Sequence, residues 1–156
     1  HTKYPPTLET VWDDHKWNTG SLSALSQGNI EDMVLYMKGL RPEYKEKSKT
    51  RFRLVGRERF PSKTYSTTAD NLSVKYLPQS SSFYSIVDAE TNDVVVPFGS
   101  GSVISCDSTG NYFNLWMDGY QPERYYKLLY RIQSGSSTDE ETDQYFDEGF
   151  VFKVTL

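Results

Sequence analysis

The chain has 156 residues, a length that accommodates one domain or two small ones. Aromatic residues make up 15% of it, enough for a substantial core, which argues against a disordered chain. The formal net charge of −4 provides no basic field for nucleic acid, and the apolar runs are far shorter than the roughly 20 residues that cross a bilayer.

The chain begins at His1, without an initiating Met or a signal-like leader, so we expect a processed product or a fragment. The first stretch that offers a regular element is 21–33, where Ser21 would cap a helix. The pair Gly28-Asn29 interrupts that stretch and argues against the helix.

Apolar residues recur with a period of two in almost every later stretch, which indicates strands whose alternate side chains face a core. The clearest alternations cover 126–132 and 150–156. Further strands are predicted at 52–55, 72–77, 83–87, 94–98, 102–106 and 112–117, separated by turn-forming clusters. Short strands at this spacing predict an all-β sandwich or barrel.

The segment 134–148 links the two clearest strands and is polar and acidic. It contains the carboxylates Asp139, Glu140, Glu141, Asp143, Asp147 and Glu148. The fixed spacing of a calcium loop is missing from it, so we interpret the segment as a solvated hairpin loop.

An internal repeat relates two parts of the chain at an offset of 80 residues. LYMKGLRPE at 35–43 aligns with LWMDGYQPE at 115–123, and strand-like alternation flanks both copies. We therefore predict two tandem sandwich units of one architecture, 1–60 and 61–156, joined near Phe60-Pro61-Ser62, with the first unit lacking its early strands.

The second copy of the repeat carries the corner residues Gly119, Tyr120, Pro122 and Tyr126 between two strands. This order resembles the tyrosine corner of immunoglobulin-like and fibronectin type III sandwiches, where the chain crosses from one sheet to the other. We expect Tyr126 to bury its ring and bond the backbone of the arch, Pro122 to restrict the arch, and Gly119 to permit its turn.

The first copy departs from this pattern. Ser48 falls where Tyr126 aligns, because the first copy is two residues longer before its next strand. Tyr44 is the alternative corner tyrosine, so the sequence leaves the first corner open between these two residues.

A local basic run, Arg51, Arg53 and Arg57, stands out from the acidic balance. Alternation places Arg51 and Arg53 opposite Phe52 and Leu54, so that they form a basic stripe for an acidic neighbouring subunit or a polyanion. The other reading is a solvated face that guards a sheet edge from aggregation. Alternation also directs Trp116 outward, so we predict an interaction surface at Arg51, Arg53, Arg57 and Trp116.

Candidates for chemistry are few. The histidines are His1 and His15, and no nucleophile elbow or phosphate loop occurs, which argues against an enzyme. Asp13, Asp14 and His15 are adjacent, and neighbours on an extended chain diverge, so they form a poor metal site. The sole cysteine, Cys106, excludes an intrachain disulfide and is expected to be a buried, unreactive thiol. We predict no catalytic residue, no cofactor and no metal.

A series of distinctive segments lies within about residues 50–156: KYLP at 75–78, FYSIVDAET at 83–91, VPF at 96–98, ISCD at 104–107, GNYF at 110–113 and QPERYY at 121–126. This series resembles the terminal sandwich region of virion structural proteins of tailed bacteriophages, especially contractile-tailed phages of cyanobacteria. The resemblance carries no catalytic signature.

The resemblance implies a non-enzymatic virion protein of the tail, neck or baseplate. Its expected partners are other virion proteins and further copies of the same chain, with no nucleic acid. The alternative is a carbohydrate-binding adhesion module for a host-surface glycan, in which exposed Trp12, Trp17, Trp116 and tyrosine rings stack on sugars.

Overall fold

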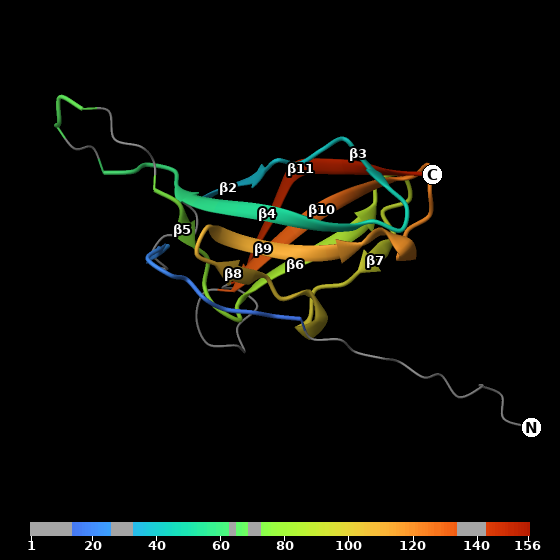
Figure 1. The fold of residues 1–156 in the computed structure, drawn as a ribbon, viewed down its shortest axis with the longest axis horizontal. Coiled ribbons are helices and arrows are strands. Elements are labelled where there is room, and N and C mark those ends of the chain that lie inside the picture. The colour runs from blue at the N-terminus through green and yellow to red at the C-terminus, as the bar shows by residue number, and fades with distance from the viewer. Residues whose placement is uncertain (1–13, 26–32, 63–64, 69–72, 134–142) are drawn as a thin grey trace, which may run out of the picture.

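The computed structural model describes residues 14–25, 33–62, 65–68, 73–133 and 143–156. These residues form a β-sandwich of two sheets, with no helix longer than a short 3₁₀ turn among them (Figure 1). The predicted all-β, immunoglobulin-like class is therefore confirmed.

The first sheet, called sheet A, has the strand order β1-β5-β4-β9-β8, and β2 also pairs with β4. Its strands are β1 Ser23–Ala24, β2 Met33–Lys38, β4 Lys49–Glu58, β5 Lys75–Tyr76, β8 Ser105–Asp107 and β9 Gly110–Trp116. The strand β4 is the centre of this sheet, because β2 pairs with one of its edges and β9 with the other.

The second sheet, called sheet B, has the order β3-β11-β10-β6-β7. Its strands are β3 Glu43–Lys45, β6 Ser82–Asp88, β7 Val94–Val96, β10 Tyr125–Gln133 and β11 Asp143–Thr155. The pairing of β3 with β11 is parallel, whereas the other pairs of this sheet are antiparallel.

This pairing follows the immunoglobulin arrangement of two sheets. In sheet A, the strands β4, β9 and β8 occupy the positions B, E and D, and β2 occupies position A. In sheet B, β6, β10 and β11 occupy C, F and G. Two short 3₁₀ turns, η2 Ser100–Ser102 and η3 Met117–Gly119, lie in the connections.

The sequence-based strands are found, with different ends. The expected strand at 102–106 is divided between η2 and β8, and β11 begins at Asp143, inside the expected acidic loop. Residues 134–142 of that loop lie outside the described residues. In the range 21–33, where a helix was considered, Ser23–Ala24 form β1, and 26–32 lie outside the described residues.

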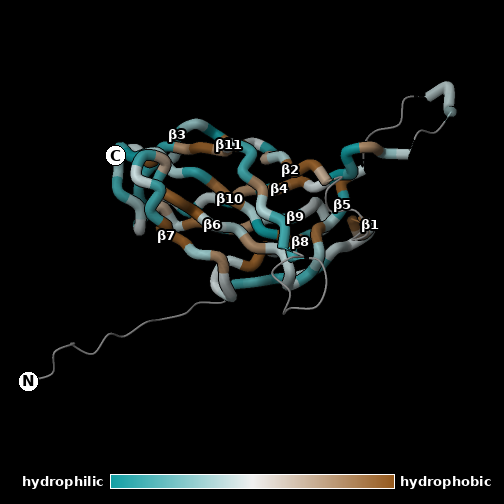
Figure 2. Tube along the Cα trace, turned by 180° about the vertical axis from the view of Figure 1, so that it is seen from behind, coloured by the Kyte–Doolittle hydropathy of each residue, from teal (hydrophilic) through white to brown (hydrophobic). Residues whose placement is uncertain are grey.

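One hydrophobic core fills the space between the sheets. Apolar and polar residues alternate along the strands (Figure 2), so that each sheet directs one apolar face inward. Aromatic contacts join the two layers: the stacked rings of Tyr84 and Phe113 have centroids 4.2 Å apart, and the tilted rings of Phe52 and Phe152 have centroids 5.4 Å apart.

The predicted division into units 1–60 and 61–156 is corrected by these contacts. The strand β4 from the first range pairs with β9 from the second, and β3 pairs with β11. Both ranges contribute to the same core cluster. The repeat misled the domain prediction because a single sandwich needs several crossings between its sheets, and the repeated motif marks such a crossing.

Candidate interaction surface

The two copies of the repeat form two arches that cross from sheet A to sheet B. The first arch, residues 39–42, connects β2 to β3, and the second, residues 117–124, connects β9 to β10. The predicted duplicated crossover is thus present within one domain.

In the second arch, Tyr126 bonds the backbone as predicted. Its hydroxyl accepts a hydrogen bond from the Gln121 N–H at 2.9 Å and donates one to the Gln121 carbonyl oxygen at 3.3 Å. The ring of Tyr120 packs against that of Tyr126 with centroids 4.9 Å apart, and both rings are buried. The left-handed backbone position is Glu123, with φ of 64°, and not Gly119 as expected.

In the first arch, the corner residue is Tyr44 and not Ser48. The Tyr44 hydroxyl accepts a hydrogen bond from the Arg41 N–H at 2.8 Å, whereas the Ser48 hydroxyl caps a turn at the Lys45 carbonyl oxygen. Arg41 and Gln121 both precede the proline of their copy, so the two tyrosines bond the same position of the motif. Gly39, with φ of 73°, makes the turn into this arch.

The end of β11 lies between the two arches. The Lys153 N–H donates to the Pro42 carbonyl oxygen at 2.8 Å, and the Val154 N–H donates to the Arg124 carbonyl oxygen at 3.1 Å. Both corner tyrosines also pack against Phe152, with centroid distances of 5.7 Å for Tyr44 and 5.8 Å for Tyr126. The predicted corner is therefore structural.

The outer face of sheet A carries most of the predicted surface. Trp116 is 62% exposed, while its neighbours Leu115 and Met117 are buried, so its predicted outward direction is confirmed. The Lys49 ammonium lies over the Trp116 ring, 4.6 Å from the centroid, because the two residues are opposite each other in the register of β4 and β9.

Arg53 is neutralised by a carboxylate on the next strand but one. Its guanidinium makes two parallel hydrogen bonds to Asp107, at 3.0 and 2.9 Å. This bidentate contact holds the pKa of Asp107 far below its usual range, because the guanidinium and Thr109 stabilise the charged carboxylate. Arg53 therefore contributes less positive potential than the sequence suggested.

Arg51 is more accessible. Its guanidinium carbon lies 4.3 Å from the centroid of Tyr112, and its Nε donates to the Asn114 side-chain oxygen at 3.2 Å. Its Nη1 lies 3.7 Å from Asp107 Oδ2, and this partly exposed ion pair contributes little to stability. Arg57 lies near the far end of β4, opposite Val34 of β2, and donates to the Glu58 carbonyl oxygen. The structure thus places Arg51 with Trp116 and separates Arg57 from them.

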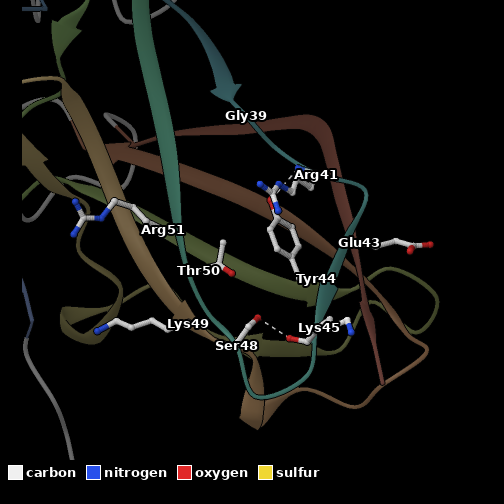
Figure 3. A pocket seen from close by; sticks show the side chains of 9 residues that line it. All are labelled: Gly39, Arg41, Glu43, Tyr44, Lys45, Ser48, Lys49, Thr50 and Arg51. Atoms are coloured by element: carbon white, nitrogen blue, oxygen red, sulfur yellow. Dashed lines mark hydrogen bonds between the residues drawn. The ribbon is translucent and has the colours of Figure 1, made fainter.

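A cavity of about 640 Å³ opens beside this face, between the first arch and the beginning of β4 (Figure 3). We call it the arch pocket. Arg41, Glu43 and Tyr44 line it from the arch side, and Lys49, Thr50 and Arg51 from β4. Figure 3 shows the Glu43 carboxylate pointing away from the cavity.

The described residues contain no group of three or more His, Cys, Asp or Glu side chains arranged to hold a metal. Of the adjacent residues Asp13, Asp14 and His15, Asp13 lies outside the described residues, and His15 stacks on Trp17 with ring centroids 6.0 Å apart. Cys106 is buried, and burial raises the pKa of its thiol to about 11, so the thiolate form that reacts is disfavoured.

No family model, no curated protein and no solved structure matches the chain. Within the part of the chain that the structure describes, no helix is both long and apolar enough to span a membrane.

Sequence reasoning missed several members of the surface. Lys49 lies just before the predicted basic run of Arg51, Arg53 and Arg57 and was not included in the predicted surface, and Asp107, Tyr112 and Arg41 were not singled out. Alternation along β4 and β9 shows which side chains point outward, but the register that sets Lys49 beside Trp116 requires the pairing of strands more than 50 residues apart.

Proposed function

We propose that this chain is a non-enzymatic structural component of a bacteriophage particle, in its tail, neck or baseplate, and that it contacts other virion proteins and further copies of itself. The resemblance over residues 50–156 supports the phage setting. The outer face of sheet A supports the contact role, because an exposed Trp116 with Lys49 and Arg51 beside it has the aromatic and basic composition of interface centres.

Association with particles tests the phage setting. Particles purified by density gradient from a lysate of a phage that encodes the chain are analysed by mass spectrometry. We expect peptides of this chain to co-sediment with the major capsid and tail proteins in a fixed ratio. Their absence from particles that contain the other structural proteins would overturn the virion assignment.

The contact surface is tested in the same particles by Trp116→Ala. Truncating a hot-spot aromatic at the centre of an interface costs about 2 kcal/mol or more, so we expect incorporation to fall at least about tenfold. Tyr145→Ala is the matched control, since Tyr145 is an aromatic of sheet B with a similar exposed fraction, 64%. Equal incorporation of both variants would place the contact elsewhere.

A glycan-binding adhesion module is a second candidate, favoured by the same exposed Trp116 ring. The Lys49 ammonium occupies one face of that ring, so a sugar that stacks on this face would have to displace it. If the chain binds glycans, a glycan array should lose its signal with Trp116→Ala and gain signal with Lys49→Ala. Absence of any signal from the unaltered chain would reject this function.

A further inference from the structure

Part of the edge of β4 lacks a neighbouring strand. The strand β2 pairs with β4 only from Met33 opposite Glu58 to Lys38 opposite Arg53. Gly39 then turns the chain into the first arch, which continues as β3 in sheet B. Within the described residues, the stretch of β4 from Lys49 to Phe52 therefore has β9 on one side and no strand on the other.

The backbone groups of Lys49 and Arg51 point toward this open edge. The Met117 N–H donates to the Ser48 carbonyl oxygen at 2.9 Å, which makes Ser48 a hydrogen-bonded position of the β4–β9 ladder. Hydrogen-bonded positions alternate in an antiparallel pair, so Thr50 and Phe52 also face β9 and the odd-numbered residues face away. Among the described residues, no backbone bond outside the ladders involves Lys49 or Arg51.

The arch pocket runs along this same stretch. It is lined by Lys49, Thr50 and Arg51 on the β4 side and by the first arch on the other (Figure 3). The opposite edge of sheet A is covered differently, since Lys16 and Asn18 exchange backbone hydrogen bonds with Cys106 of β8. The open stretch of β4 thus combines unpaired backbone groups with a cavity that has room for an added chain.

The charged residues that line the arch pocket are mostly basic, which favours an acidic ligand. Arg41, Lys45, Lys49 and Arg51 line it against the single carboxylate of Glu43. This excess of positive charge occurs in a protein whose net charge is −4. In Figure 3 the side chains of Lys49 and Arg51 extend away from the first arch, and their charged ends lie over Trp116 and Tyr112 of β9. A segment that adds at the open edge would have to draw them toward those of its side chains that lie on the outer face of sheet A.

We propose that the arch pocket binds an extended acidic segment of another polypeptide, which adds to sheet A as a strand beside Lys49–Phe52. The added backbone bonds the N–H and C=O groups of Lys49 and Arg51. Carboxylates at alternate positions of the segment face the two basic side chains, and the intervening side chains lie over Thr50 and Tyr44. This site goes beyond the contact surface around Trp116 and does not depend on the virion assignment.

Charge reversal on the protein gives the first test, with the acidic peptide TDTETDT as the probe and TNTQTNT as its neutral counterpart. We expect calorimetry to detect binding of the acidic peptide, and Arg51→Glu to weaken it at least about tenfold, as loss of a charged pair does. Arg57→Glu is the matched control, because Arg57 lies on the same strand where β2 covers the edge. Thermal unfolding confirms that both variants fold.

Methylation of peptide amides distinguishes strand addition from simple charge attraction. Alternate amides of an added strand point at β4, so methylating one alternate set should abolish binding while methylating the other set leaves it unchanged. Antiparallel addition assigns the sensitive set to the acidic residues, since residues opposite Arg51 share its face. Equal effects of both sets, equal binding of polyphosphate or the neutral peptide, or no binding of the acidic peptide would each overturn the proposal.

Discussion

The two arches carry the same motif and cross between the same two sheets, yet they close the sandwich to different degrees. The second arch is sealed by the buried Tyr120 and by two hydrogen bonds of Tyr126 to Gln121. The first arch has one such bond, from Arg41 to Tyr44, and leaves the arch pocket open beside it.

The difference follows from what each arch joins. The strands β9 and β10 are both interior strands, with neighbours on each side in their sheets. The strands β2 and β3 lie at edges, so the chain leaves β4 uncovered when it moves from one sheet to the other. One motif therefore serves as a seal between interior strands and as the wall of a site between edge strands.

The largest loss of stability should come from replacing the residue that contacts the corner tyrosines of both arches. Phe152 is buried and contacts the rings of both Tyr44 and Tyr126. Phe152→Ala removes this support and leaves a cavity, so we expect the free energy of unfolding to fall by about 3–5 kcal/mol. Urea unfolding followed by tryptophan fluorescence measures this. A loss below about 1 kcal/mol would show that the arches do not depend on their common ring.

Removing the hydroxyl group of each corner tyrosine tests how much each arch contributes to stability. Tyr126→Phe removes a donor and an acceptor and leaves both backbone groups of Gln121 without this partner, so we expect a loss of about 2 kcal/mol. Tyr44→Phe removes one acceptor and should cost about 1 kcal/mol. Urea unfolding of the two variants side by side is the measurement, and the opposite ranking would contradict the stronger seal at the second arch.

The two glycines of the motif provide a smaller contrast. Gly39 has φ of 73°, so Gly39→Ala forces an alanine into the left-handed region and should cost about 1 kcal/mol even though the added Cβ has open space. Gly119 is not among the positive-φ residues and its Cβ position is also open. Gly119→Ala should therefore change the unfolding free energy by less than about 0.5 kcal/mol, and comparable losses in both variants would reject this assignment.

The extent of sequence prediction also differs between the arches. The role of Tyr126 in the second corner was predicted, although that of Gly119 was not, because Tyr126 lies at the start of a strand whose alternation is unambiguous up to Ile132. The first corner stayed open between Ser48 and Tyr44, since β3 has three residues and no period can be read from so short a strand. From the spacing of the repeat alone, two crossings between the sheets of one sandwich were interpreted as two domains.

The candidate surface shows the same limit. The outward direction of Arg51 and Trp116 follows from a period of two, and the structure confirms it. The bidentate contact of Arg53 with Asp107 and the arch pocket depend on which strands pair and where β2 leaves sheet A, and neither is encoded in local periodicity. The segment 143–148 was assigned to a loop because its acidic side chains obscure the alternation expected of a strand, although it forms the first part of β11.

The last contrast is electrostatic and should be the smallest. Beside the second arch, Asp88 accepts hydrogen bonds from the backbone N–H groups of Glu90 and Thr91 and from the Arg124 guanidinium, at 2.9, 3.1 and 2.6 Å. These bonds stabilise the carboxylate and lower the pKa of Asp88. No such carboxylate ties the first arch among the described residues.

A lowered pKa in the folded protein means that Asp88 stabilises the fold above the ordinary carboxyl pKa and that this contribution disappears as pH falls through the lowered value. We therefore expect the difference in thermal midpoint between the unaltered chain and Asp88→Asn to be constant from neutral pH to about pH 5 and to shrink below about pH 4. The variant removes the titrating group but keeps its shape, so other carboxylates cancel in the difference. If the difference in thermal midpoint instead grew as the pH falls, charged Asp88 would destabilise the fold. The hydrogen bonds of Asp88 would then not explain the tighter closure of the second arch.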